Sequence, residues 1–194
     1  MFGLFRKKMA PEGPVEFGLH VEIERSAQDV YRLLDWADEA NAKRGEGHQV
    51  LPGDAPGQWR LIMTGMEDVT YHLRVTDEEP GRVYGYDCLP EPMVGKLVSS
   101  HELFRVESLA PDRCRVTLEL KARFASGMTE KLFAQHVSMM SEACHSSLAR
   151  LKIHAEEGAD AARDAEIVSP RCIRVEGEAG IIVHAAPCFS CQNR

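Results

Sequence analysis

The stretch VEFGLHVEIERSAQDVYRLL, residues 15–34, contains a strand pattern that passes directly into a helix start. Apolar residues occupy every second position from Val15 to Ile23, which is the period of a half-buried β-strand. Ser26 and Asp29 follow the pattern of a helix capping box, with Asp in place of the usual Glu. Apolar spacing continues to Ala37, so we expect a helix of about three to four turns. This stretch therefore predicts a strand followed at once by a short helix.

The sequence after this helix alternates between short apolar runs and turn residues. Gly and Pro are concentrated in residues 52–57 and 80–81, between runs that alternate with period two. Short turns between consecutive strands require antiparallel pairing, so the runs predict a single curved antiparallel sheet. The six strands expected after the helix cover residues 49–51, 58–66, 69–75, 83–89, 97–108 and 113–124.

A long amphipathic helix is predicted over residues 129–157. Its apolar residues step by three or four positions, from Phe133 through Val137, Met140 and Cys144 to Leu148. About 28 residues at 1.5 Å each give roughly 40 Å of helix, which must lie along the sheet. The fold class is therefore α+β, with a strongly curved antiparallel sheet of about seven strands wrapped around a long C-terminal helix.

Composition and charge are those of an ordinary globular protein. Of 194 residues, 44% are hydrophobic and 27% charged, and the formal net charge is −7. Because basic residues form no run beyond Arg6–Lys8, a nucleic-acid partner is not expected. We expect three parts: a flexible N-terminal segment (1–14), one ligand-binding domain (15–157) and a loosely ordered C-terminal extension (158–194).

No transmembrane segment or secretory signal is expected, because no apolar run approaches the length of a membrane span. The six cysteines are dispersed, which does not match a disulfide-stapled scaffold. Without an export signal, we predict reduced thiols and a cytoplasmic location.

The order of these elements resembles that of the START-like helix-grip (SRPBCC) superfamily, in its bacterial polyketide cyclase/dehydrase-like branch. The resemblance covers about residues 15–157. It rests on residues 26–34 after the first strand, on the acidic-Pro turn in residues 75–83, on the hairpin in residues 107–119 and on the helix end in residues 147–156. It implies a cavity between sheet and helix for a lipid, a polyketide or another apolar small molecule. It transfers no catalytic residue, because the superfamily has no universal catalytic motif.

Apolar residues on the long helix and on the inner faces of the strands are the candidates for lining such a cavity, although each one could instead fill the core. The predicted ligand-binding residues are Trp59, Met63, Tyr71, Tyr84, Tyr86, Phe104, Leu118, Leu120, Phe133, Val137, Met140 and Cys144.

Polar residues among these apolar positions are the candidates for acid or base chemistry. If Phe104 faces inward, Glu102 and Ser100 share its face, whereas the opposite phase turns His101 and Arg105 inward. His136 lies on the apolar stripe of the long helix. Glu102 and His136 are therefore the catalytic candidates, and the alternative is a hydrogen-bonded core pair or a solvated face.

The C-terminal tail contains the only combination of residues that suggests a metal. Cys188 and Cys191 form a Cys-x-x-Cys pair, with Cys172 and His184 upstream. These residues are candidate zinc ligands, but the spacing is not that of a recognised finger, so we expect neither a metal nor a cofactor.

Three functions are compatible with the sequence. The first is binding of a small hydrophobic or amphipathic molecule without chemistry, and the second is a cyclase, dehydratase or hydrolase that uses acid/base residues of the cavity. The third is a module that recruits a protein partner through an apolar groove. The sequence does not determine the oligomeric state or whether the chain is an enzyme.

Overall fold

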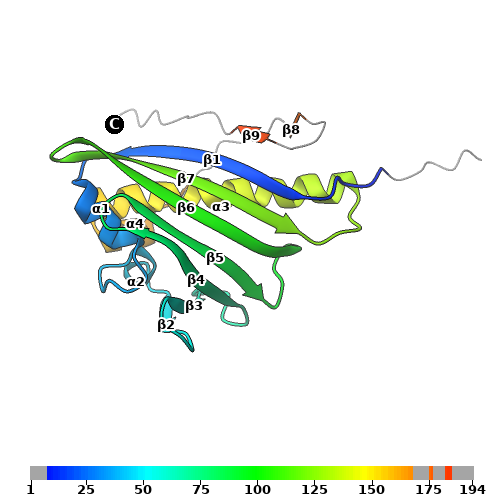
Figure 1. Ribbon diagram of the computed structural model, residues 1–194, viewed down its shortest axis with the longest axis horizontal. Coiled ribbons are helices and arrows are strands. Elements are labelled where there is room, and N and C mark those ends of the chain that lie inside the picture. The colour runs from blue at the N-terminus through cyan, green and yellow to red at the C-terminus, as the bar shows by residue number, and fades with distance from the viewer. Residues whose placement is uncertain (1–7, 168–174, 177–181, 185–194) are drawn as a thin grey trace, which may run out of the picture.

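The computed structural model describes residues 8–167, 175–176 and 182–184 of the chain. One mixed sheet and a long helix dominate it (Figure 1). The strands lie in the order β2-β3-β4-β5-β6-β7-β1-β9-β8. Their bounds are β1 (Pro14–Ile23), β2 (Gln49–Pro52), β3 (Gln58–Ile62), β4 (Thr70–Glu79), β5 (Val83–Glu91), β6 (Leu97–Ala110), β7 (Arg113–Phe124), β8 (Val175–Glu176) and β9 (Ile182–His184).

The first seven strands confirm the predicted antiparallel sheet. Every neighbouring pair from β2 to β1 is antiparallel. The last of these pairs joins β7 to β1, so the first strand in the sequence lies beside the seventh. Beyond β1, β9 adds in parallel and β8 pairs with β9 in antiparallel fashion. The strand expected over residues 58–66 is shorter than predicted, because a turn begins at Met63, whose carbonyl accepts from the Met66 N–H.

The long helix α3 (Glu130–Glu157) confirms the predicted 28-residue element. The Thr129 side chain accepts from the Leu132 N–H and caps its N-terminus. Figure 1 shows α3 running along one face of the sheet, with α1, α2 and α4 gathered near one end. One flank of α3, including Phe133, Val137 and Leu148, is buried in the hydrophobic core. We call the sheet face toward α3 the inner face.

Helix α1 (Ala27–Leu34) begins where predicted and ends earlier than predicted. Ser26 accepts from the Asp29 N–H, while its hydroxyl donates to the Asp29 carboxylate. The helix has 8 residues rather than three to four turns, because other groups take its next hydrogen bonds. The Tyr84 hydroxyl accepts from the Trp36 N–H at 3.0 Å, and the Asp35 carboxylate accepts from the Ala37 N–H.

Two further short helices lie near the end of α3. Asn41 caps α2 (Ala42–Gly45), so a segment predicted only to end the first helix starts another one. Residues just after α3 form α4 (Ala159–Asp164), in which Ala162 is fully buried. This part of the predicted loosely ordered extension is therefore a packed helix.

The start of the described chain also contacts α3. The Ala10 N–H donates to the Met128 carbonyl, and Lys8 pairs with Glu130 at 2.9 Å. Residues 8–10 therefore dock at the N-terminus of α3, within the segment for which the sequence suggested flexibility.

Candidate functional site

A cavity of about 330 Å³ separates the inner face of the sheet from α3. Strands β3 to β7 supply one wall, and α3 supplies the other. Most of the lining is apolar, and Met139 and Ala143 on α3 are exposed. The cavity is lined by Trp36, Lys43, Leu61, Met63, Tyr71, Leu73, Tyr86, Cys88, Val94, Gly95, Leu97, Ser100, Glu102, Leu118, Leu120, Phe124, His136, Met139, Met140, Ala143, Cys144 and Ser147.

Glu102 provides the acidic group in this apolar lining. Strand β6 places it on the inner face, where it pairs across the sheet with Tyr86 on β5 and Leu120 on β7. The Tyr86 hydroxyl donates to Glu102 Oε2 at 2.8 Å, and the Ser100 hydroxyl approaches Oε1 at 3.3 Å. The inward phase of β6 is thus the one with Ser100 and Glu102, whereas His101 lies on the outer face.

Burial raises the pKa of Glu102, outweighing the hydrogen bonds from Tyr86 and Ser100 and the charge of Lys43, which lower it. Among the described residues no cation bonds directly to this carboxyl group. Burial also raises the pKa of Tyr86, and the Glu102 charge adds to that effect. The cavity therefore favours the un-ionised forms of both groups.

The two cysteines in the lining are poor nucleophiles. Burial is the main cause that raises the pKa of both Cys88 and Cys144, and the charge of Glu102 adds to it. A thiol must lose its proton to act as a strong nucleophile, so these side chains serve as apolar walls.

The turn after α1 positions Trp36 at one end of the cavity. Its backbone N–H is held by Tyr84, and its carbonyl accepts from the Arg44 guanidinium at 3.1 Å. The Trp36 ring lies edge-on to the Tyr86 ring at 5.3 Å between centroids. Trp36 is thus fixed beside the Tyr86–Glu102 pair.

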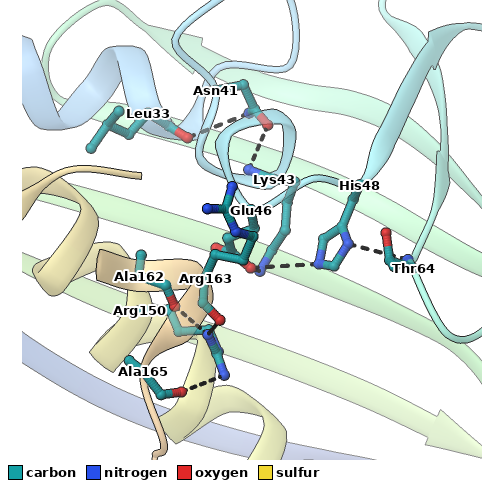
Figure 2. Close-up of polar contacts among 10 residues, drawn as sticks. All are labelled: Leu33, Asn41, Lys43, Glu46, His48, Thr64, Arg150, Ala162, Arg163 and Ala165. Atoms are coloured by element: carbon teal, nitrogen blue, oxygen red, sulfur yellow. Dashed lines mark hydrogen bonds and ion pairs between the residues drawn. The ribbon is translucent and has the colours of Figure 1, made fainter. Parts of the chain in front are cut away.

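A polar cluster of Lys43, Glu46 and His48 packs behind the same end of the cavity (Figure 2). Lys43 Nζ lies 2.9 Å from Glu46 Oε2, and His48 Nε2 lies 3.5 Å from the same oxygen. Thr64 donates its N–H to His48 Nδ1, so the proton of a neutral ring is on Nε2 and faces Glu46. Lys43 belongs both to this cluster and to the cavity lining.

Glu46 is ionised in this cluster. Burial alone would raise the pKa of Glu46, but the hydrogen bond from His48 and the charge of Lys43 outweigh it and lower the pKa to about 2.

Helix α4 is attached to α3 by Arg150. Figure 2 shows Arg150 of α3 donating to the carbonyls of Ala162 and Ala165. These contacts fix α4 against α3.

The structure places seven of the twelve predicted ligand-binding residues in the cavity lining: Met63, Tyr71, Tyr86, Leu118, Leu120, Met140 and Cys144. The other five lie elsewhere. Tyr84, Phe104, Phe133 and Val137 are buried core residues, and Trp59 packs under the Arg44 guanidinium at 5.7 Å. A period-two or 3.6 pattern identifies the inward face but not which part of that face is covered by packed side chains.

Both predicted catalytic residues, Glu102 and His136, line the cavity. No hydrogen bond or ion pair joins them within the described part of the chain. His136 Nδ1 is buried without a hydrogen-bond partner there and lies near Gly95. The side chain within hydrogen-bond distance of the Glu102 carboxyl group is Tyr86, not His136.

Sequence reasoning missed several lining residues, of which Trp36 and Lys43 matter most. The predicted helix ran to Ala37 and so included Trp36, whereas in the structure Trp36 lies in the α1–α2 connection and Lys43 in a four-residue helix. Trp36 was missed because α1 ends earlier than its apolar spacing predicted. No pattern in the sequence distinguishes Lys43 from other surface lysines.

A wider hollow of about 690 Å³ lies on the outer face of the sheet. Its charged side chains are largely paired with one another, as in Arg74 with Asp87 at 2.6 Å and His101 with Asp87 at 3.0 Å. Such cross-strand ion pairs are typical of a solvated sheet face. The smaller inner cavity, with apolar walls and a carboxyl group whose pKa is raised by burial, is the better candidate site.

The candidate zinc ligands Cys172, Cys188 and Cys191 lie outside the described residues, and only the backbone of His184 is described. Within the described ranges, His, Cys, Asp and Glu form no group of three that suits a metal ion. No helix in these ranges is long and apolar enough to cross a membrane. The cytoplasmic location stays a prediction.

Comparison by sequence finds no matching family model and no matching curated protein. Comparison by structure finds the aromatase/cyclase ZhuI from Streptomyces sp. R1128, with a TM-score of 0.52 and 17% identity over 75% of this chain and 98% of that one. The di-domain aromatase/cyclase BexL matches with a TM-score of 0.57 and 19% identity, over 72% of this chain and 45% of that one. The Aha1 dimer from Colwellia psychrerythraea matches at 0.53 and 16% identity, over 74% and 98%.

These likenesses concern the fold, since the identities are low, and they agree with the strand order and the gripped helix described above. The chain has the helix-grip fold, as do the aromatase/cyclases ZhuI and BexL.

Proposed function

We propose that the chain binds a small apolar or amphipathic molecule in the cavity between the sheet and α3. The observation that supports this most strongly is a mainly apolar cavity of about 330 Å³ that is lined by many residues of the hydrophobic core. Pockets that hold small molecules have this size and character. The proposed binding unit comprises residues 15–157, and the role of the C-terminal tail lies outside the proposal.

Burial of apolar surface would drive binding, at about 25 cal/mol for each Å² removed from water before the costs of association. Three methionines, Met63, Met139 and Met140, line the cavity. Their unbranched side chains adapt to ligands of different shape, which suits a binding protein better than a rigid core. The exposed Met139 and Ala143 mark the side from which a ligand would enter.

The uncharged fluorescent probe N-phenyl-1-naphthylamine tests the proposal. We expect saturable binding with a stoichiometry of one. Ala143→Trp places a bulky ring at the entrance and should weaken binding at least tenfold, because the ring would occupy space that the probe needs. Gln135→Trp is the matched control, since Gln135 is exposed on the same helix and does not line the cavity.

The expected result for the control is wild-type affinity. Absence of saturable binding, or equal affinity in the wild type and Ala143→Trp, would contradict the proposal. If the probe bound outside the cavity, both tryptophan variants would behave alike.

One observation favours a second function, acid catalysis on a carbonyl compound. Tyr86 and Glu102 are two titratable groups within 2.8 Å of each other, and an un-ionised Glu102 can supply a proton. Glu102→Gln separates the two functions, because the amide keeps the size of the side chain without being an acid. A bound molecule that is chemically altered by wild type and unaltered by Glu102→Gln would establish catalysis.

A further inference from the structure

The Trp36 end of the cavity contains a hydrogen-bond donor without an acceptor. Trp36 is 4% exposed and lines the cavity, and its indole N–H has no hydrogen-bond partner among the described residues. Buried N–H groups in native proteins are nearly always paired, with protein or with a bound molecule. The unmatched indole therefore favours an occupant that supplies an acceptor.

Glu102 provides a second donor at the same end. The hydroxyls of Tyr86 and Ser100 already donate to its two carboxyl oxygens. Burial favours the protonated form of Glu102, in which the carboxyl group carries a proton of its own. With both neighbouring hydroxyls acting as donors, that proton remains available for a group in the cavity.

Lys43 is a third donor beside these two. Its ammonium group has three N–H bonds, and the structure shows one hydrogen bond, to Glu46. Lys43 lines the cavity, and its charge acts on Glu102. The far end of the cavity is mainly apolar, with Val94, Leu97 and Phe124, and its polar side chain is His136, which lies near Gly95.

We propose that the ligand carries an acceptor oxygen, either a carbonyl or a carboxylate, which accepts from Trp36, Glu102 and Lys43, while its apolar remainder extends toward Phe124. This inference rests on the proposed function and adds the ligand's polar chemistry and its orientation. A ligand amine would bring a further donor to a region that already has three. The site therefore selects against amines and gains little from a plain hydrocarbon.

Compounds that share one ring frame isolate this preference. Fluorene has no polar group, 9-fluorenone adds a carbonyl oxygen, fluorene-9-carboxylate adds an anionic acceptor, and 9-aminofluorene adds a donor. Their affinities are measured by displacement of N-phenyl-1-naphthylamine from the full chain. We expect fluorenone to bind roughly tenfold more tightly than fluorene, as one or two added hydrogen bonds allow, and the amine to bind no better than fluorene.

Comparison of fluorene-9-carboxylate with 9-fluorenone distinguishes the two kinds of acceptor, a carboxylate and a carbonyl oxygen. If Lys43 dominates recognition, fluorene-9-carboxylate binds more tightly than fluorenone, and Lys43→Met removes that advantage. If Trp36 and Glu102 dominate, fluorenone binds more tightly and Lys43→Met has little effect. Either order supports an acceptor ligand, whereas tightest binding of 9-aminofluorene overturns it.

Three substitutions at Trp36 and Glu102 connect the preference for fluorenone to named groups. Trp36→Phe keeps an aromatic ring and removes the N–H, so it should weaken fluorenone binding roughly fivefold and leave fluorene binding unchanged. Glu102→Gln retains a donor and should keep most of the preference, whereas Glu102→Leu should lose it. Gln135→Leu changes an exposed residue of α3 that does not line the cavity and is the control, for which we expect the wild-type ratio of affinities.

The outcomes separate this inference from the function on which it depends. Equal affinities for fluorene and fluorenone in wild type would overturn the acceptor inference while leaving apolar binding in place. Failure of every compound to bind would overturn both. A fluorenone preference that survives both Trp36→Phe and Glu102→Leu would also contradict the inference.

Discussion

Glu46 and Glu102 lie in neighbouring regions of the molecule, yet their surroundings favour opposite protonation states. Glu46 is in the polar cluster, where His48 and Lys43 lower its pKa to about 2. Glu102 is in the cavity, where burial raises its pKa and its close partners are hydroxyl groups. Lys43 lies between the two regions, bonded to Glu46 and lining the cavity.

The contrast separates a structural region from a functional one. The ionised Glu46 is paired with Lys43 of α2 and with His48, which directly precedes β2, and so joins these two elements. Burial favours the protonated form of Glu102, whose hydrogen-bond partners are the hydroxyls of Tyr86 and Ser100. Pairs of titratable groups with opposite pKa shifts are a common feature of sites where different roles are assigned to similar side chains. Breaking the Glu46 contacts should therefore affect stability, whereas changing Glu102 should affect binding.

The largest effect is expected from Glu46→Gln. This substitution leaves Lys43 without its buried partner, so we expect it to reduce the free energy of unfolding at pH 7 by about 2–3 kcal/mol. Because folding lowers the pKa of Glu46, its contribution is present above the usual value of 4.5 and is lost as the pH falls toward 2. Urea unfolding at several pH values measures both effects.

Glu39→Gln is the control for this prediction, because Glu39 is exposed in the same part of the chain. It should change the free energy of unfolding by less than about 0.5 kcal/mol. A Glu46→Gln variant as stable as wild type at pH 7 would show that the cluster is not a structural anchor.

A smaller effect is expected from Lys43→Met, which removes one of the two partners of Glu46 and leaves His48 in place. We expect a loss of about 1–2 kcal/mol in the free energy of unfolding at pH 7. Lys43 also lowers the pKa of Glu102, so the substitution should raise the Glu102 pKa further. Carboxyl ¹³C shifts during a pH titration measure this, and an unchanged or lower Glu102 pKa would contradict the assigned position of Lys43.

The smallest effect on stability is expected from Glu102→Gln, and its sign depends on pH. Because folding raises the pKa of Glu102, wild type loses stability as the pH rises from about 4.5 through the folded-state pKa. The amide does not ionise, so the variant should gain stability relative to wild type over the same range. Parallel stability curves for the two proteins between pH 4 and 9 would show that Glu102 is not shifted upward.

The fold was predictable because its signals are local and periodic. The Ser26–Asp29 cap, the alternation in β1 and the stripe on α3 each follow from residues close in sequence. The position of Glu102 on the inner face was one of two alternatives, and cross-strand pairing with Tyr86 selects it. A strand pattern alone cannot distinguish these phases when polar residues occupy both faces.

The site was only partly predictable, because it depends on where packing stops. Phe104 and Leu120 both face inward, yet only Leu120 lines the cavity. That difference depends on which side chains from α1, α3 and the connecting loops cover each position. Trp36 reaches the cavity because Tyr84 and Arg44 redirect its backbone after α1, and these contacts are distant in sequence.

The most direct test of ligand binding in the cavity is methyl NMR of the full chain with ¹³C-labelled methionine, recorded during titration with N-phenyl-1-naphthylamine. Met63, Met139 and Met140 line the cavity, whereas Met9 and Met128 lie outside it. We predict that the first three methyl signals shift with saturation and show contacts to the probe ring, while those of Met9 and Met128 stay in place. Shifts confined to Met9 and Met128, or no shifts at saturating probe, would contradict a ligand site between the sheet and α3.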